Sequence, residues 1–128
     1  MDTPTILIVD DESGQRETIR SYVEPRMRCS IVEAASGADA VSYIKANRCD
    51  LIILDIKMPH SGGLEVLDVA KNKEISVIIY SAWDSEQVFN ECEARGIVDY
   101  VTKGGSIRVL GDKAIKELKR KGMYAPRP

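Results

Sequence analysis

The chain has 128 residues, of which 44% are hydrophobic and 30% are charged, as expected for one globular domain. Its net charge of −2 gives no electrostatic basis for binding nucleic acid or an anionic membrane, and its apolar runs are too short to span a bilayer. Three widely spaced cysteines, one histidine and an N-terminus without a signal-peptide pattern argue against a zinc site and predict a cytoplasmic protein that needs no disulfide.

Strand-like and helix-like segments alternate five times along the chain. Three segments contain near-continuous apolar runs, at 6–9, 51–54 and 77–79, and this pattern is typical of parallel strands that are covered on both faces. The second strand is the weakest prediction, because its sequence is short and mixed. We expect strands at residues 5–10, 29–34, 50–55, 75–81 and 97–102.

Helices fit between these strands and after the last one. The first is expected from about residue 14 to residue 24, where Pro25 ends it. The second begins after Ser36, which is a suitable N-cap, and the third follows Gly62-Gly63. The fourth begins near Asp84 or Ser85 and stops at Gly96. The fifth has the clearest helical period, with apolar side chains at Ile107, Leu110, Ala114, Ile115 and Leu118.

Strict alternation of strands and helices predicts a doubly wound α/β fold. Right-handed crossovers leave few arrangements, and the flavodoxin-like order 2-1-3-4-5 suits five short units, as a five-stranded parallel sheet between two helix layers. This order places the first and third strands side by side. We expect residues 1–121 to form the domain and residues 122–128 to be a short tail, either frayed or the start of a linker.

Carboxylates follow the apolar cores of the first and third strands. Asp10 and Asp11 end the first strand, and Asp55 ends the third. Ligands of an open parallel sheet bind at this carboxyl edge, where the strand order reverses. Two carboxylates about 5 Å apart repel each other by about 3 kcal/mol at an effective dielectric constant of 20. A hard divalent cation removes this repulsion, and Mg²⁺ is the natural candidate because it takes oxygen ligands.

A hydroxyl and an ammonium group are expected at the same edge. Ser81 ends the fourth strand and Lys103 follows the fifth, and together with a bound cation they would neutralise and hydrogen-bond phosphoryl oxygens. The sequence has no P-loop, so the phosphoryl acceptor must be a side chain. Asp55 is the carboxylate best placed to attack, because aspartyl phosphates are established covalent intermediates.

Several motifs, in the same order, resemble the receiver domain of two-component response regulators. The resemblance covers essentially all of residues 4–121, and the combination is far more specific than any one motif. The motifs are Ile8-Val9-Asp10-Asp11, Leu54-Asp55 with Met58-Pro59, Gly62-Gly63, Tyr80-Ser81-Ala82, and Asp99-Tyr100 with Lys103.

The resemblance implies a metal site and a phosphoacceptor. Asp55 would accept the phosphoryl group. Asp11, Asp55 and the backbone carbonyl of Lys57 would bind Mg²⁺ directly, while Asp10 would act through water. These assignments are expectations carried over from the family, residue by residue.

The resemblance also implies a set of residues that respond to phosphorylation. Ser81 and Lys103 would contact the phosphoryl group, and Tyr100 would be an aromatic switch that turns inward when Ser81 moves. Taken alone, Ser81 could be a simple turn residue and Tyr100 ordinary packing. Asp10 or Asp11 could likewise cap the first helix.

The implied function is a signalling switch rather than an enzyme that turns over a metabolite. The donor would be a sensor histidine kinase or a phosphotransfer protein, and a downstream effector domain or protein would read the surface formed by the fourth helix, fifth strand and fifth helix. The domain would catalyse its own phosphorylation and a slow dephosphorylation. A homodimer through that surface, with Asp99 and Lys113 contributing, stays open. We expect no direct contact with nucleic acid or membrane.

Three positions depart from the family pattern. Gly104 follows Lys103 where the family usually has proline, so we expect a trans peptide bond and a more mobile Lys103 or a different loop path. Lys57 and Trp83 lie two residues after Asp55 and Ser81, where the family flanks the path of the hydrolytic water. Neither side chain carries a carboxylate or amide to orient that water, which predicts slow autodephosphorylation.

Two other functions compete with the signalling switch. A phosphatase of the haloacid dehalogenase type needs a second aspartate two residues after the nucleophile, and Lys57 stands there. A flavodoxin-like cofactor binder would have to hold the phosphate of FMN beside an acidic loop at Asp10 and Asp11, which would repel it. Yellow colour in the purified protein would distinguish that case.

Overall fold

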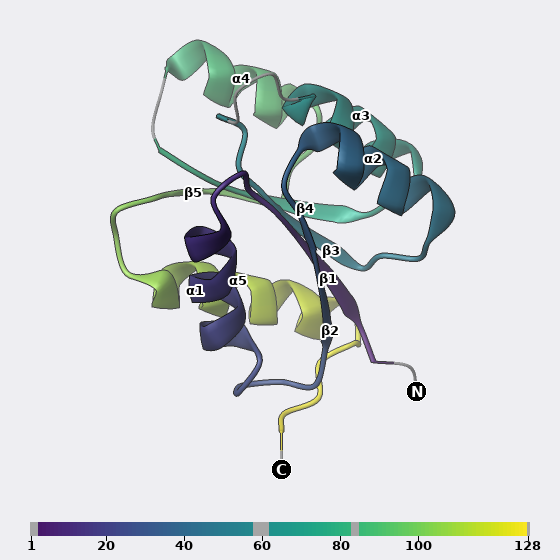
Figure 1. Ribbon diagram of the computed structural model, residues 1–128, viewed down its shortest axis with the longest axis vertical. Helices are drawn as coiled ribbons and strands as arrows, with labels where there is room; N and C mark the ends of the chain where they lie inside the picture. Colours follow the sequence, from purple (N-terminus) through teal and green to yellow (C-terminus); the bar gives the residue numbers. More distant parts are fainter. Residues whose placement is uncertain (1–2, 58–61, 83–84, 128) are drawn as a thin grey trace.

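The computed structural model describes residues 3–57, 62–82 and 85–127, in which five strands alternate with five helices (Figure 1). The expected positions Met58, Pro59, Trp83 and Asp84 lie outside the described residues. The elements are β1 (Thr5–Val9), α1 (Ser13–Val23), β2 (Ser30–Ala34), α2 (Gly37–Ala46), β3 (Leu51–Leu54), α3 (Gly63–Asn72), β4 (Ser76–Ser81), α4 (Glu86–Ala94), β5 (Asp99–Thr102) and α5 (Ile107–Arg120).

The sheet is entirely parallel and has the predicted order β2-β1-β3-β4-β5. Val9 of β1 lies opposite Leu54 of β3, so the residues that follow them, Asp10 and Asp55, leave neighbouring strands at the same level. Both aspartates were expected inside the strands but lie just beyond their ends. The main-chain amide of Asp55 still donates to the carbonyl of Val9 at 2.9 Å, which fixes the start of the loop.

Helices cover both faces of the sheet. Helices α1 and α5 lie on one face, and α2, α3 and α4 lie on the other (Figure 1). Alternate residues of β1 enter the two cores, Leu7 and Val9 on the side of α2 and α3, and Ile6 and Ile8 on the side of α1 and α5. The central strand β3 is therefore apolar at every position, because neither of its faces meets water.

Helix boundaries follow local signals that the sequence carries. Ser36 and Ser85 cap α2 and α4, and their side chains accept hydrogen bonds from the amides of Asp39 and Val88. Gly96 follows α4 with a φ of 81°, as predicted for a glycine stop. The largest boundary difference is at β5, which begins at Asp99 rather than at residue 97.

The C-terminal tail contacts the rest of the domain as far as residue 127. Met123 and Tyr124 pack against the core beneath α1 and α5. The amide of Arg28 donates to the carbonyl of Ala125 at 2.9 Å, and the Arg127 side chain donates to the carbonyl of Glu24. The tail therefore lies along the connection between α1 and β2, while the domain boundary at residue 121 stays a prediction. No helix in the described part of the chain is both long and apolar enough to cross a membrane.

Helices α1 and α5 approach each other closely at Gly111, and this contact can be tested by substitution. A Cβ atom at Gly111 would lie 2.1 Å from Cε1 of Tyr22. Gly111→Ala should lower the free energy of unfolding by about 1–3 kcal/mol, because this overlap outweighs the higher helix propensity of alanine. Urea unfolding measures the change.

The matched control for this substitution is Gly14→Ala in α1. A Cβ at Gly14 meets no atom within 4 Å, so this variant should be more stable than the natural protein by up to about 1 kcal/mol. Equal stabilisation by Gly14→Ala and Gly111→Ala would show that Tyr22 does not pack on Gly111 as described.

Candidate functional site

Three carboxylates converge where the carboxyl ends of β1 and β3 meet. Asp10 and Asp11 lie in the loop after β1, and Asp55 lies directly after β3. One oxygen from each lies within 4.8 Å of the others. Asp10 and Asp55 are buried, with exposed fractions of 1% and 6%, while Asp11 is exposed. The predicted acidic cluster is therefore present, and one of its members faces solvent.

Lys103 places its ammonium group between the two buried carboxylates. Its Nζ lies 2.7 Å from Oδ2 of Asp10 and 2.9 Å from Oδ2 of Asp55. Burial alone would lower the pKa of this ammonium, but the hydrogen bonds and charges of Asp10 and Asp55 outweigh burial, and the pKa of Lys103 is raised. Lys103 is therefore a firmly charged partner for both carboxylates at neutral pH.

The loop that carries Lys103 departs from β5 with a trans bond to Gly104, as predicted. Gly104 has a φ of 97°, a conformation that glycine adopts without strain. The amide of Lys103 donates to the carbonyl of Ser81 at 2.9 Å, so β4 fixes the base of this side chain. The greater mobility expected for Lys103 stays a prediction.

Asp55 is also held by two hydrogen-bond donors on its other oxygen. Oγ of the fully buried Ser81 donates to Oδ1 of Asp55 at 2.7 Å. The amide of Lys57 donates to the same oxygen at 2.9 Å. Ser81 therefore contacts Asp55 directly, and the peptide group of Lys57 lies beside the same carboxylate, while a functional role of Ser81 stays a prediction. Its carbonyl as a metal ligand stays a prediction.

Asp10 serves the site and does not cap a helix. The N-cap position of α1 is Glu12, whose side chain makes no capping hydrogen bond, so neither Asp10 nor Asp11 occupies it. Instead, Oδ1 of Asp10 accepts a hydrogen bond from the amide of Glu12 at 2.9 Å. Together with Lys103 on Oδ2, this bond engages both carboxylate oxygens of Asp10.

Tyr100 lies on β5, which β4 separates from the strand before Asp55, and packs against α4. Its ring centroid is 5.5 Å from that of Phe89, with the two rings tilted by 59°. Its hydroxyl group donates a long hydrogen bond of 3.5 Å to the carbonyl of Ala82, the residue after Ser81. Tyr100 thus links Phe89 to the loop that follows Ser81, while its role as a switch stays a prediction.

Two further residues of the site were not predicted from the sequence. Nη1 of Arg16 donates to the main-chain carbonyl of Asp10 at 2.5 Å, and Nε donates to Oε1 of Glu33 at 2.8 Å. Arg16 lies on α1 and Glu33 on β2, so no local motif joins them. From the sequence alone, a charged residue on the first turns of a helix is expected to be an ordinary solvated side chain.

The donor set fits a hard divalent cation. Asp10, Asp11 and Asp55 supply only oxygen ligands, which suit Mg²⁺, whereas zinc sites in proteins favour nitrogen and sulfur. Within the described ranges, Lys103 is the cationic side chain that pairs with Asp10 and Asp55. One ammonium against three carboxylates leaves an excess of negative charge that a cation can neutralise.

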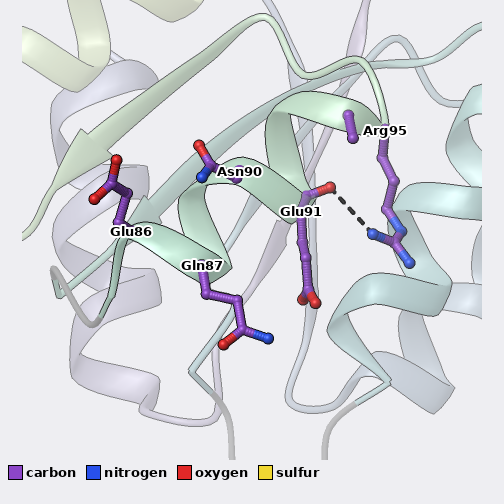
Figure 2. Close-up of a pocket in the computed structure, with 6 residues that line it drawn as sticks. Glu86, Gln87, Asn90, Glu91 and Arg95 are labelled. Carbon is purple, nitrogen blue, oxygen red and sulfur yellow. Dashed lines mark hydrogen bonds between the residues drawn. The ribbon is translucent and has the colours of Figure 1, made fainter.

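An open hollow lies elsewhere, on the outer face of α4. It has a volume of about 490 Å³, and its polar side chains are shown in Figure 2. The Arg95 guanidinium turns back along this face and donates to the carbonyl of Glu91 at 3.1 Å (Figure 2). The hollow shares no residue with the acidic cluster. Its lining residues are Glu86, Gln87, Asn90, Glu91, Ala94 and Arg95.

Comparison with known proteins gives one consistent family. Residues 6–115 match the response regulator receiver domain. The chain is 31% identical over 121 residues to the transcriptional regulatory protein YvrH of Bacillus subtilis. The aligned region covers 94% of this chain and 51% of YvrH. It is 36% identical over 103 residues to a protein-glutamate methylesterase/protein-glutamine glutaminase of Treponema pallidum, covering 77% and 26% respectively. The chain thus spans about half, or less, of these relatives.

Solved structures agree with the sequence comparison. The receiver domain of the Francisella response regulator 1452 is 30% identical, with a TM-score of 0.80 over 93% of this chain and 99% of that one. A DNA-binding response regulator of the LuxR family from Staphylococcus aureus is 27% identical, with a TM-score of 0.80 over 89% and 98%. Both similarities extend over nearly the whole chain.

Removing the Lys103 ammonium should expose the repulsion within the acidic cluster. Lys103→Met should lower the free energy of unfolding by about 3 kcal/mol in metal-free buffer, because Asp10 and Asp55 are left buried without their cation. Mg²⁺ should then stabilise the variant more than it stabilises the natural protein. Urea unfolding with EDTA and with MgCl₂ measures both effects.

Lys113→Met is the control, because it breaks the half-exposed ion pair with Asp99 and should cost at most about 1 kcal/mol. Its response to Mg²⁺ should equal that of the natural protein. A Lys103→Met variant with natural stability and a natural Mg²⁺ response would contradict the role assigned to this ammonium.

Proposed function

Because the chain belongs to the response regulator receiver family, we propose that it is a phosphorylation-dependent signalling switch in which Asp55 accepts a phosphoryl group. The observation that carries this proposal is the surroundings of Asp55. Its side chain has Lys103 on one oxygen and Ser81 on the other, and Asp10 and Asp11 lie beside it. A nucleophile, a cation and a hydroxyl donor are thus assembled around one carboxylate.

The proposed donor is a phosphohistidine of a sensor histidine kinase or a phosphotransfer protein. An oxygen of the Asp55 carboxylate attacks phosphorus and forms the new O–P bond of an acyl phosphate. The P–N bond to the imidazole breaks, and the departing nitrogen keeps the electron pair and takes up a proton. The domain thus catalyses its own phosphorylation and turns over no free metabolite.

The residues around Asp55 bind and neutralise the transferred group. Asp10, Asp11, Asp55 and the carbonyl of Lys57 would hold Mg²⁺, which when bound supplies positive charge to the phosphoryl oxygens. Lys103 gives up part of its pairing with the carboxylates and contacts a phosphoryl oxygen instead. The carboxylates alone would repel the incoming anion, so these positive charges make the transfer possible.

Ser81 provides a route from phosphorylation to the surface of the domain. Its hydroxyl now donates to Asp55, and after transfer it donates to the phosphoryl group. We propose that Tyr100 then loses its bond to the carbonyl of Ala82 and turns inward, away from Phe89. The surface of α4, β5 and α5 changes shape, and a downstream effector domain or protein recognises the change. We propose that phosphorylation and recognition by the effector take place in the cytoplasm.

The same surface is the proposed site of a homodimer, should one form. Asp99 and Lys113 are paired with each other within one chain, so a dimer that used them would have to exchange this pair between copies. Val98 and Val109 are the exposed large apolar residues among those described; Val109 lies on α5, and Val98 directly precedes β5. The receiver domain does not by itself specify the effector, because the relatives that contain it include a transcriptional regulatory protein and a protein-glutamate methylesterase/protein-glutamine glutaminase.

Phosphorylation of Asp55 is directly measurable. Incubation with acetyl phosphate and MgCl₂ should add the mass of one phosphoryl group to the intact protein, as detected by mass spectrometry. Asp55→Asn should show no addition, and EDTA should prevent it in the natural protein. The exposed Asp39→Asn variant is the matched control and should be modified normally. Modification of Asp55→Asn to the natural extent would contradict the proposal.

The acyl phosphate should persist for minutes to hours at neutral pH, because Lys57 offers no acceptor to orient a hydrolytic water. Lys57→Asn introduces an amide at this position and should shorten the half-life several-fold, while Lys57→Met, which lacks an amide, should not. Loss of the added mass over time measures the rate. A half-life of seconds in the natural protein would contradict this expectation.

A further inference from the structure

Strand β2 holds the main chain of Asp10 at two points. The amide of Asp10 donates to the carbonyl of Ala34 at 3.1 Å. The carbonyl of Asp10 accepts the bond of 2.5 Å from Arg16, which is anchored in turn on the carboxylate of Glu33 at 2.8 Å. The Arg16 side chain is only 15% exposed, so its guanidinium is fixed between two acceptors rather than free in solvent.

Glu33 is a stable anchor for this arrangement. It also receives hydrogen bonds from Arg20, the shorter of them 2.8 Å. The bond from Arg20 is the main cause that lowers the pKa of Glu33, burial opposes it, and the bond from Arg16 lowers the pKa further. Glu33 therefore stays ionised at neutral pH, so its carboxylate remains an acceptor for Arg16.

The orientation of the Asp10 carbonyl determines the position of the main-chain amide of Asp11. A peptide group is planar, so fixing the carbonyl of residue 10 also fixes the amide of residue 11. Asp10 and Asp55 have buried carboxylates with several hydrogen bonds of their own. Among the described residues, none donates a hydrogen bond to the carboxylate of Asp11, which is exposed. The position of Asp11 therefore depends on its main chain.

We propose that Arg16 is a positioning residue that aims Asp11 into the acidic cluster and thereby sets its affinity for a divalent cation. The proposal rests on the proposed function only for the identity of the cation. The change in cation affinity expected from losing this positioning is opposite to the change expected from losing the charge of Arg16. A positive charge close to the cluster repels a cation, so loss of Arg16 by charge alone would strengthen binding. Loss of positioning would weaken it.

Arg20 provides a matched control for Arg16. Both residues lie on α1, both carry one positive charge and both pair with Glu33, but the contact with the Asp10 carbonyl belongs to Arg16. Arg16→Ala should weaken Mg²⁺ binding by about tenfold, the lower end of the range for residues that orient metal ligands. Arg20→Ala should leave the affinity unchanged or slightly increase it. Titration calorimetry of the full chain with MgCl₂ measures both.

A second readout needs no metal. In EDTA, Arg16→Ala should accelerate hydrogen exchange at the amide of Glu12, which bonds to Asp10, as followed by NMR. Arg20→Ala should leave this amide protected. Arg16→Lys should behave like Arg16→Ala, because one ammonium does not reproduce the two divergent N–H donors of the guanidinium. Natural affinity and natural exchange in Arg16→Lys would show that charge suffices, and would overturn the proposal.

Glu33→Gln tests the same anchor if Arg16→Ala does not fold, and it should weaken Mg²⁺ binding in the same direction. Unchanged or tighter binding in the folded variant would overturn the proposal. The outcome is separable from the proposed function. Weaker Mg²⁺ binding in Arg16→Ala, together with no phosphorylation of Asp55 in the natural protein, would contradict the proposed function but not the positioning role. Normal phosphorylation of Asp55 in the natural protein, together with unchanged Mg²⁺ affinity in Arg16→Ala, would contradict the positioning role but not the proposed function.

Discussion

The ammonium of Lys103 between Asp10 and Asp55 is the interaction on which the rest of the site depends. A parallel sheet of this order brings the ends of β1 and β3 together. Two carboxylates about 5 Å apart repel each other by about 3 kcal/mol at an effective dielectric constant of 20. Lys103 compensates this repulsion from a third strand end, at 2.7 and 2.9 Å. The fold can therefore keep a concentrated negative site at the edge of its sheet without any ligand bound.

The same ammonium makes the site exchangeable. Under the proposed function, a divalent cation would compete with Lys103 for the carboxylates, and a phosphoryl group on Asp55 would attract Lys103 and Ser81 away from them. Each new ligand thus rearranges partners that already exist and leaves no buried charge uncompensated, which would be costly. Asp10, Asp55, Lys103 and Ser81 form one hydrogen-bonded network, and we propose that its arrangement depends on what is bound at Asp55.

The sheet and the main site residues could be predicted because both depend on patterns local in sequence. Continuous apolar runs identify central parallel strands, and the topology then places the residues after them at one edge. Arg16 and the Phe89 partner of Tyr100 could not be predicted, since they depend on where side chains point in three dimensions. The tail had the composition of a linker, but Tyr124 and Met123 complete a core that no local pattern reveals.

Two kinds of restraint divide the site into a fixed part and a responsive part. The main chain of Asp10, through which Asp11 is proposed to be placed, is restrained by Arg16 and Ala34, and neither contact involves Asp55. Asp55 is held by Ser81 and Lys103, whose partners are proposed to change on phosphorylation. Tyr100 in turn contacts Phe89 of α4 and the carbonyl of Ala82. We infer that movement passes toward β4, β5 and α4, because the contacts proposed to change on phosphorylation lie on this side, while the restraints from α1 and β2 keep Asp10 in place.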